Sequence, residues 1–420
     1  MLAVAVCGCN ALTGLAGNEY DRVPEPGCET GFADCDGRAD NGCEAHVDSD
    51  ENRCGPTCQP CGSAADSYPV CVGGKCGIAC NGGFGDCDVD ESNGCEVAFD
   101  KDPEGCGSCG WSCEGGTCEL GRCGSVEIAA VSSGTISGLA VTSDQLLYSS
   151  SDGEVGRVSV TGGSALPLVV EPGVQFTGLV AGGGRAYWFS SPEGEFYECI
   201  SSLPGTVSDL RMVPIEGGEA PVLDQSSACF EALAADDAFV FTNATGYDGM
   251  SYFHELRRVD PSAASPPLVW VLPAEGDFFF DTTPQPFAMD DNSIFWIAGY
   301  LLHTAPRNFA GAPTVLARGV NGPLVVDETD IFFLKSNAIR RMPKAGGRML
   351  QVATASTQVL AVDADSVFWS SNGAVVRAGK DGSNATVLLQ AAPASHLVVG
   401  AGRLFYASNN AVYKLVLPAL

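Results

Sequence analysis

A short pattern recurs seven times in the last three quarters of the chain. It consists of three apolar residues, a polar turn and a hydrophobic–aromatic pair, and the pairs are Leu147-Tyr148, Tyr187-Trp188, Val240-Phe241, Phe295-Trp296, Phe332-Phe333, Phe368-Trp369 and Phe405-Tyr406. The last four aromatic residues are 37, 36 and 37 residues apart. A fixed period of this kind, built from short strands, is typical of β-propellers. The pattern predicts an all-β fold in which residues 125–420 form a seven-bladed propeller with four-stranded antiparallel blades.

The end of the chain indicates how this ring closes. The last repeat begins at Leu397 and the chain ends at Leu420, which leaves room for three strands rather than four. We expect the fourth strand to come from the apolar segment 126–131, just ahead of the first blade. Such pairing joins the two ends of the ring and hides two sheet edges.

Cysteines divide the chain sharply, because 18 of the 20 lie at or before Cys123. Eight cysteines at residues 28–76 recur at residues 80–123, and the first four of each set are offset by 52 residues. Eight is an even number, so each copy can close four disulfides, although 105 pairings are open. Zinc is the weaker alternative, because His46 is the only histidine nearby. The density predicts disulfides and an oxidising compartment.

These modules resemble a known kind of repeat. The segments Gly31-Phe32-Ala33-Asp34-Cys35-Asp36-Gly37 and Asn41-Gly42-Cys43-Glu44 are similar to the cysteine-rich repeats of secreted and lipid-anchored myxobacterial proteins. The resemblance covers residues 28–123 and implies an extracellular bacterial protein, without implying a reaction. The propeller repeats resemble those of low-density-lipoprotein-receptor-type and NHL-like domains. The receptor-type Tyr-Trp-Thr-Asp motif is not intact, and residues 187–190 come nearest to it.

The N-terminus is read in two ways. The segment Val6-Cys7-Gly8-Cys9 resembles a bacterial lipobox, in which Cys9 would be the lipidated cysteine. The alternative is that these are ordinary residues of a ragged start. An acylated Cys9 would anchor the protein to a membrane without spanning it.

Alternating carboxylates in the cysteine-rich modules could hold calcium, the one cofactor that the sequence suggests. The residues are Asp34 and Asp36 in the first module and Asp86, Asp88 and Asp90 in the second. Carboxylates at this spacing can converge on a hard cation. The glycine that calcium loops need at their sixth position is missing from both copies, so a solvated turn is the favoured reading.

Long insertions in the second and third gaps between repeats, and a shorter one in the fourth, suggest a ligand-binding surface. The insertions follow second strands and therefore share one face of a propeller with the connections between blades. They carry candidate ligand-binding residues, namely Tyr197, Tyr247, Tyr252, His254, Tyr300 and His303. Aromatic side chains on long loops over a rigid scaffold suit binding. The alternative is local packing. Cys199 and Cys229, the only propeller cysteines, are expected to form a disulfide there.

The sequence favours binding over catalysis. It contains no nucleophile elbow, no zinc-protease motif and no phosphate loop. The formal net charge of −29 argues against nucleic acid as a partner. We therefore expect a secreted or cell-surface lipoprotein that binds protein or polysaccharide at the envelope. A propeller enzyme of the lactonase or hydrolase type and a structural envelope component stay open. The expected domains are a signal remnant and tether (1–27), two cysteine-rich modules (28–76 and 77–124) and the propeller (125–420).

Overall fold

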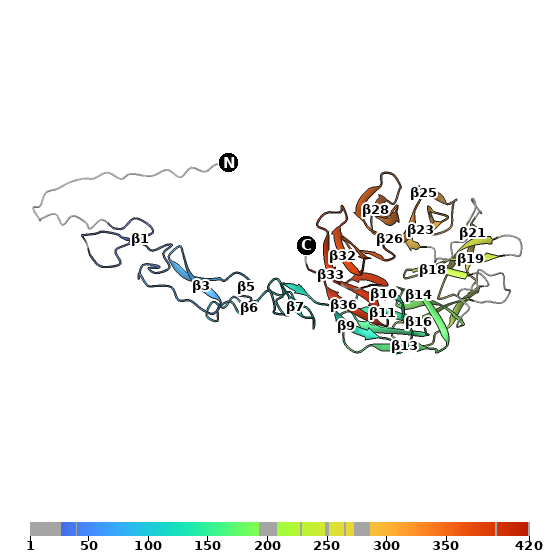
Figure 1. Ribbon diagram of the computed structural model, residues 1–420, viewed down its shortest axis with the longest axis horizontal. Coiled ribbons are helices and arrows are strands. Elements are labelled where there is room, and N and C mark those ends of the chain that lie inside the picture. The colour runs from blue at the N-terminus through green and yellow to red at the C-terminus, as the bar shows by residue number, and fades with distance from the viewer. Residues whose placement is uncertain are drawn as a thin grey trace, which may run out of the picture. The chain divides into compact units, whose positions relative to one another are not determined.

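The computed structural model describes residues 27–38, 40–192, 208–226, 229–247, 252–263, 266–272, 286–390 and 393–418. The chain forms two compact units, divided between Phe99 and Asp100 (Figure 1). The second unit therefore includes residues 100–124, the second half of the second cysteine-rich module, together with the ring. The described residues contain no helix with the length and hydropathy of a transmembrane segment.

Short hairpins stapled by disulfides build the cysteine-rich region. The hairpins are β1 (Phe32–Ala33) with β2 (Ala45–His46), β3 (Ser67–Val72) with β4 (Lys75–Cys80), β5 (Phe84–Gly85) with β6 (Val97–Ala98), and, in the second unit, β7 (Cys118–Glu119) with β8 (Arg122–Cys123). Seven bonds join Cys28–Cys43, Cys35–Cys58, Cys54–Cys71, Cys61–Cys76, Cys80–Cys95, Cys106–Cys118 and Cys113–Cys123. Cys87 and Cys109 are disulfide-bonded as well. In the chain-entropy model, closing loops of this size contributes roughly 3 kcal/mol per bond.

The ring consists of seven four-stranded antiparallel blades, as the sequence predicts. Blades 1 to 3 contain β10 (Ile136–Val141), β11 (Gln145–Ser150), β12 (Glu154–Ser159), β13 (Leu166–Val170); β14 (Val174–Gly182), β15 (Arg185–Pro192), β16 (Ser208–Pro214), β17 (Val222–Ser226); β18 (Cys229–Ala235), β19 (Val240–Tyr247), β20 (Tyr252–Val259), β21 (Leu268–Leu272). Blades 4 and 5 contain β22 (Phe287–Met289), β23 (Ser293–Ala298), β24 (Leu301–Pro306), β25 (Thr314–Arg318); β26 (Asn321–Val326), β27 (Asp330–Lys335), β28 (Ala338–Pro343), β29 (Leu350–Thr354). Blades 6 and 7 contain β30 (Leu360–Val362), β31 (Ser366–Ser371), β32 (Ala374–Gly379), β33 (Thr386–Leu389); β34 (His396–Gly400), β35 (Arg403–Ser408), β36 (Ala411–Val416), β9 (Val126–Ala130).

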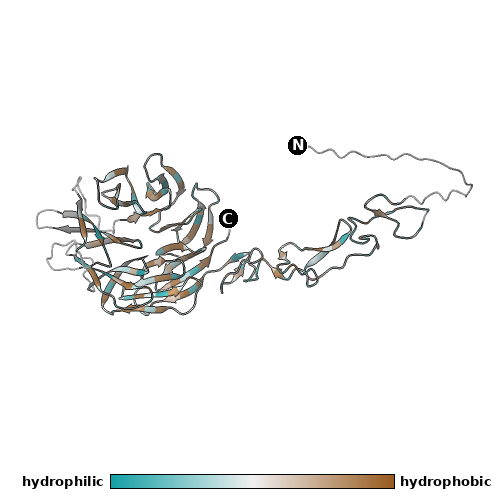
Figure 2. Cartoon of the chain, turned by 180° about the vertical axis from the view of Figure 1, so that it is seen from behind, coloured by the Kyte–Doolittle hydropathy of each residue, from teal (hydrophilic) through white to brown (hydrophobic). Residues whose placement is uncertain are grey.

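The hydrophobic–aromatic pair holds neighbouring blades together. Successive side chains of a strand point to opposite faces of its sheet. In blade 5, Phe332 packs in the apolar cluster shared with blade 6, and Phe333 packs in the cluster shared with blade 4. One such cluster lies at each of the seven blade interfaces. Figure 2 shows the hydrophobic residues running along the strands of the propeller.

The ring closes as the sequence predicts. Strand β9 pairs antiparallel with β36, and Ala130 lies opposite Ala411 in the register. The seventh blade therefore takes three strands from the C-terminal end of the chain and its outermost strand from residues just ahead of blade 1. Figure 1 shows this pairing at the closure seam, where β9 lies beside β36.

A carboxylate from the cysteine-rich region fastens this seam. Glu114 belongs to the loop beside the Cys113–Cys123 bond, and it accepts hydrogen bonds from Arg403 Nε at 2.8 Å and Lys414 Nζ at 3.0 Å. Lys414 Nζ also donates to the carbonyl oxygen of Thr161 in blade 1 at 2.5 Å. The Lys414 side chain is 1% exposed. Burial opposes ionisation of Glu114, but the hydrogen bonds from these two cations outweigh it and lower the pKa of the carboxyl.

A repeated ion pair joins several other blades. In blades 4 and 5, an aspartate opens the turn between the first and second strands, and Lys344 and Lys380 of the following blades reach Asp290 and Asp327 at 2.6 and 2.7 Å. Arg307 and Asp236 form the same pair between blades 4 and 3. Asp363 opens the corresponding turn of blade 6. We call these ion pairs inter-blade brackets. At the closure seam, the corresponding ion pairs are those of Glu114 with Arg403 and Lys414.

Replacing the seam carboxylate tests this arrangement. Glu114→Gln leaves Lys414 buried beside a neutral amide, and breaking a buried ion pair typically costs about 3–5 kcal/mol. Because Glu114 is 26% exposed, we expect a loss of unfolding free energy at the lower end of that range, measured by urea denaturation of the full chain. Glu119→Gln, an exposed change in the same module, is the control and should alter stability by about 0.5 kcal/mol or less. Equal stability of the two variants would contradict a stabilising role of Glu114 at the closure seam.

The brackets predict acid sensitivity. Burial opposes ionisation of Asp327, but hydrogen bonds from Lys380 and from the Thr329 and Asp330 amides hold its pKa below the ordinary 3.8. A lowered folded-state pKa adds stability above the unfolded-state pKa, and that stability is lost as pH falls through the folded-state value. The free energy of unfolding should therefore drop between pH 5 and about pH 2.

Lys380→Met removes the cation but keeps the turn-capping aspartate. This variant should show a smaller acid-induced loss of stability than the parent, by about 1 kcal/mol for a half-buried pair. Lys101→Met, at an exposed position of the cysteine-rich region, should leave the pH dependence of urea denaturation unchanged. If Lys380→Met has the same pH dependence of stability as the parent, the brackets do not contribute to the acid sensitivity.

Candidate functional site

The antiparallel blades give the ring two distinct faces. Turns between first and second strands, and between third and fourth strands, lie on one face, where the brackets form; we call it the bracket face. Turns between second and third strands share the opposite face with the connections from blade to blade. We call this the connection face, and it is the face on which the sequence places the candidate ligand residues.

Short turns on the connection face require left-handed backbone. Asn337, Asn372 and Asn409 have φ values of 55°, 52° and 56° in blades 5, 6 and 7. Asparagine tolerates this region better than other non-glycine residues. All three side chains are exposed, so these turns present a row of amide groups to solvent.

Tyr300 occupies the corresponding turn of blade 4. Its φ is 62°, and its side chain is 61% exposed. A bulky residue in the left-handed region costs roughly 1 kcal/mol or more, and such strain often accompanies function. The Tyr300 carbonyl accepts a hydrogen bond from Val320 N–H at 3.0 Å. This bond fixes the turn against the connection to blade 5 and leaves the ring facing solvent.

Two cations lie beside this turn, and the sequence reading missed both. Arg318, at the end of β25, is the cross-strand partner of Leu301, which directly follows Tyr300. Lys335 Nζ donates to the carbonyl oxygen of Arg318 at 2.5 Å. Strand register places Arg318 beside the turn, and a contact between blades 4 and 5 brings Lys335 to it. No sequence motif therefore marks either residue.

Of the other candidate ligand residues, only His303 has a side chain that the structure describes. His303 lies within β24 and stacks on Trp296, with ring centroids 5.2 Å apart and planes 11° from parallel. This contact agrees with the local-packing alternative. Tyr247 ends β19, and Tyr252 and His254 lie in β20, but their side chains are outside the described part of the structure. Tyr197 lies outside the described residues altogether.

Two predictions that involve three cysteines remain predictions. Cys9, the candidate lipidation site, and Cys199 lie outside the described residues. Cys229 begins β18, opposite Thr245, but its side chain is not among those described. The Cys199–Cys229 disulfide and the lipid anchor therefore stay predictions from the sequence.

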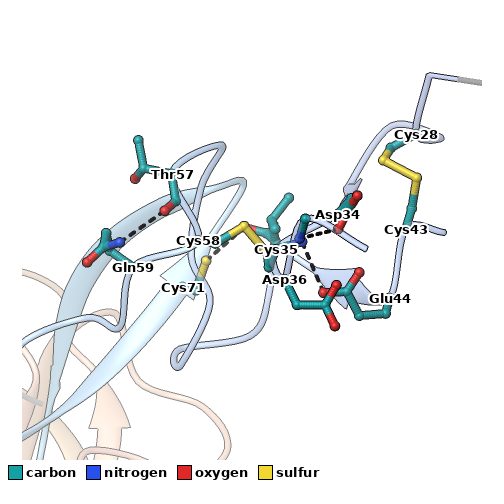
Figure 3. Close-up of a disulfide and its surroundings, with 12 residues drawn as sticks. Cys28, Asp34, Cys35, Asp36, Cys43, Glu44, Thr57, Cys58, Gln59 and Cys71 are labelled. Carbon is teal, nitrogen blue, oxygen red and sulfur yellow. Dashed lines mark hydrogen bonds between the residues drawn. A yellow bond between two sulfur atoms is a disulfide. The ribbon is translucent and has the colours of Figure 1, made fainter. Parts of the chain in front are cut away.

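The carboxylates of the cysteine-rich modules converge in two equivalent clusters. In the first, carboxylate oxygens of Asp34, Asp36 and Glu44 lie within 4.8 Å of one another, close to the Cys35–Cys58 bond (Figure 3). Glu44 Oε1 accepts a hydrogen bond from Cys35 N–H at 3.0 Å, and its Oε2 atom is buried with no hydrogen-bond partner among the described atoms. The second cluster consists of Asp86, Asp88 and Glu96.

The second cluster differs from the sequence expectation in one member. Asp90 Oδ1 accepts hydrogen bonds from the backbone and hydroxyl of Ser92 at 3.0 and 2.6 Å, and Asp90 is not in the cluster. Glu96 joins instead, through the Gly-Cys-Glu segment of the repeat. Hydrogen bonds from the Asp90 amide and the Asn93 side chain lower the pKa of Asp88. Three carboxylates with few cationic neighbours could bind a hard cation.

His396 is a further titratable group on an innermost strand. It begins β34, next to β10 in the ring. Burial lowers its pKa, so the imidazole is neutral at neutral pH. Its Nδ1 atom lies 3.1 Å from the Ser395 hydroxyl. A single histidine at this position does not make a catalytic constellation.

Calcium binding at the two carboxylate clusters can be measured directly. Isothermal titration of the full chain should detect two sites with dissociation constants of about 10⁻⁴–10⁻³ M, the range of extracellular modules. Glu96→Gln keeps an acceptor for the Cys87 amide and should remove one site. Asp90→Asn is the matched control and should keep both. Absence of binding heat, or equal effects of the two variants, would reject calcium.

Comparison with known proteins assigns no family. No family model and no curated protein sequence matches the chain. Among solved structures, it is similar to the computationally designed Ika8 protein (12% identity, 69% of this chain and 99% of that chain, TM-score 0.47). It is also similar to BamB from Moraxella catarrhalis (12%, 71% and 93%, 0.46) and to a chain of the nidogen/laminin complex (13%, 62% and 84%, 0.36). Similarity at this level carries no information about function.

Proposed function

We propose that this protein is an extracytoplasmic binding protein that holds its ligand on the connection face without changing it chemically. The disulfide-bonded cysteines of the cysteine-rich region support an oxidising compartment. The ligand is a protein or polysaccharide at the cell envelope. A lipid on Cys9 would keep the propeller at a membrane surface while the ring itself stays in water.

One observation carries the proposal. Tyr300 is held 61% exposed in a left-handed turn on the connection face, although asparagine meets the same backbone requirement in three other blades. Exposed tyrosine is a poor choice for folding and a good one for binding, because it offers a large, rigid surface with a polar tip. Arg318 and Lys335, next to the turn, add charge to the same patch.

The test uses the full chain and cell envelopes of its source organism. Wild-type protein should bind isolated envelopes saturably, and Tyr300→Asn should weaken that binding about tenfold, the loss expected when a hot-spot side chain is removed. Asparagine suits the backbone of this turn, so the variant should fold, as far-UV circular dichroism can verify.

A matched control separates a specific contact from general stickiness. Tyr68→Asn removes a tyrosine that is 51% exposed in the cysteine-rich region, and it should bind envelopes like the wild type. Material eluted from the wild-type protein should have the same mass as the input, which distinguishes binding from hydrolysis. Wild-type binding by Tyr300→Asn would overturn the proposed site.

A further inference from the structure

Charge is distributed unevenly between the two faces of the ring. Residues 287–418, which supply blades 4 to 6 and three strands of blade 7, contain 11 basic and 8 acidic residues, a net charge of +3 in a chain of net −29. All eight acidic residues lie in or next to turns of the bracket face, at Asp290, Asp291, Asp327, Glu328, Asp330, Asp363, Asp365 and Asp381. This half of the connection face therefore carries no carboxylate from these residues.

Two of those acidic residues are also neutralised by brackets. Asp290 and Asp327 pair with Lys344 and Lys380, which uses cations of the bracket face as well. Arg318 and Lys335, at the connection face, form no ion pair with a described carboxylate. Their charge is available to an anion from outside.

A third cation extends this patch into the interface between blades 4 and 5. Arg340 lies in β28 opposite Phe333, whose ring packs toward blade 4. Its Nε atom is buried and has no hydrogen-bond partner among the described atoms. We call these three basic residues of blades 4 and 5 (Arg318, Lys335 and Arg340), none of which forms an ion pair with a described carboxylate, the cationic patch.

The rest of this face offers hydrogen bonds rather than apolar anchors. The turns present the exposed amides of Asn337, Asn372 and Asn409. In the described part of blades 4 to 7, three large hydrophobic residues are exposed, namely Tyr300, Leu350 and Val387. Leu350 begins β29 and Val387 is the second residue of β33, and both strands start from bracket-face turns. Among the described residues of these blades, Tyr300 is therefore the exposed large hydrophobic side chain on the connection face.

We infer that this half of the connection face binds an anionic polysaccharide, an inference that rests on the binding role proposed above. Guanidinium groups pair with carboxylate or sulfate groups in a bidentate geometry. Amide side chains hydrogen-bond to sugar hydroxyls, and the Tyr300 ring offers a flat apolar surface to a sugar ring. The row of turns across blades 4 to 7 suits an extended chain more than a compact ligand.

An acidic protein segment is the other source of carboxylates, and the surface fits it less well. Protein interfaces depend on a desolvated core with aromatic and aliphatic anchors. Apart from Tyr300, such anchors are missing from this half of the face in the described residues. A polar, amide-rich surface with one aromatic residue instead matches the chemistry of a charged carbohydrate.

The experiment titrates the full chain with four polymers of similar length. Polygalacturonate supplies carboxylates on sugars, dextran sulfate supplies sulfates on sugars, dextran is the uncharged sugar control and poly-L-glutamate is the acidic peptide control. We expect at least one of the two anionic polysaccharides to bind tightly enough for calorimetry at 50 mM NaCl. Dextran should not bind, and poly-L-glutamate should bind at least tenfold more weakly.

Two variants with the same change in charge localise the binding. Arg318→Glu should weaken binding at least tenfold. Arg348→Glu reverses an exposed charge beyond β28 on the bracket face, and it should change the dissociation constant less than twofold. Tyr300→Asn should weaken binding at least threefold without changing the net charge, which separates the aromatic contact from electrostatics.

Specific results overturn the inference. Failure of both anionic polysaccharides to bind would exclude the ligand class, and equal losses for Arg318→Glu and Arg348→Glu would reduce the effect to overall charge. Binding of poly-L-glutamate as tight as that of the polysaccharides would indicate an acidic protein partner. If the wild-type protein binds envelopes in a Tyr300-dependent way but binds neither polygalacturonate nor dextran sulfate, the proposed binding function is supported and the polysaccharide inference is wrong.

Discussion

The alternation of side chains along a β-strand is the constraint on which the ring depends. A blade can join two neighbours only if its second strand carries a large apolar residue on each face, which is why two such residues stand side by side in every repeat. Phe368 and Trp369 illustrate this, because they lie in different blade interfaces. Fully burying such a side chain stabilises the fold by about 1.5–3 kcal/mol, and the ring repeats that gain around its circumference.

This constraint also explains why the architecture is readable in the sequence. Burial at both interfaces fixes residue types and period, so the blade number and the closing strand β9 follow from spacing alone. The seam is different. Nothing near Glu114 in the sequence indicates Lys414, because their pairing arises only after the ring has brought residues 300 positions apart into contact. Disulfide connectivity stays hidden for a different reason, because eight cysteines allow 105 pairings and only the folded backbone brings particular sulfur atoms together.

The candidate binding face shows how far sequence reasoning reaches. Insertions and aromatic content led to the proposal of Tyr300, which the structure shows exposed on the connection face, but also to His303, which stacks on Trp296. It missed Arg318, because a single arginine at a strand end resembles many others. Its position becomes informative because residues 287–418 place no carboxylate on the connection face, and the composition of the whole chain does not show this property of the folded ring. The net charge of the whole chain points in the opposite direction.

Closing a ring with strands from opposite ends imposes an order on biosynthesis. Strand β9 is made before any blade, and its partner β36 is the last strand of the ring to be synthesised. Until then, β9 has an unpaired edge and Ile128 has no blade to cover it. Exposed edges of this kind invite pairing with other chains. The neighbouring disulfides Cys106–Cys118 and Cys113–Cys123 join residues that are all synthesised before β9. An export pathway that keeps the chain apart from its copies until residue 416 emerges would suit this fold, and truncation at the C-terminus would leave an open ring rather than a smaller one.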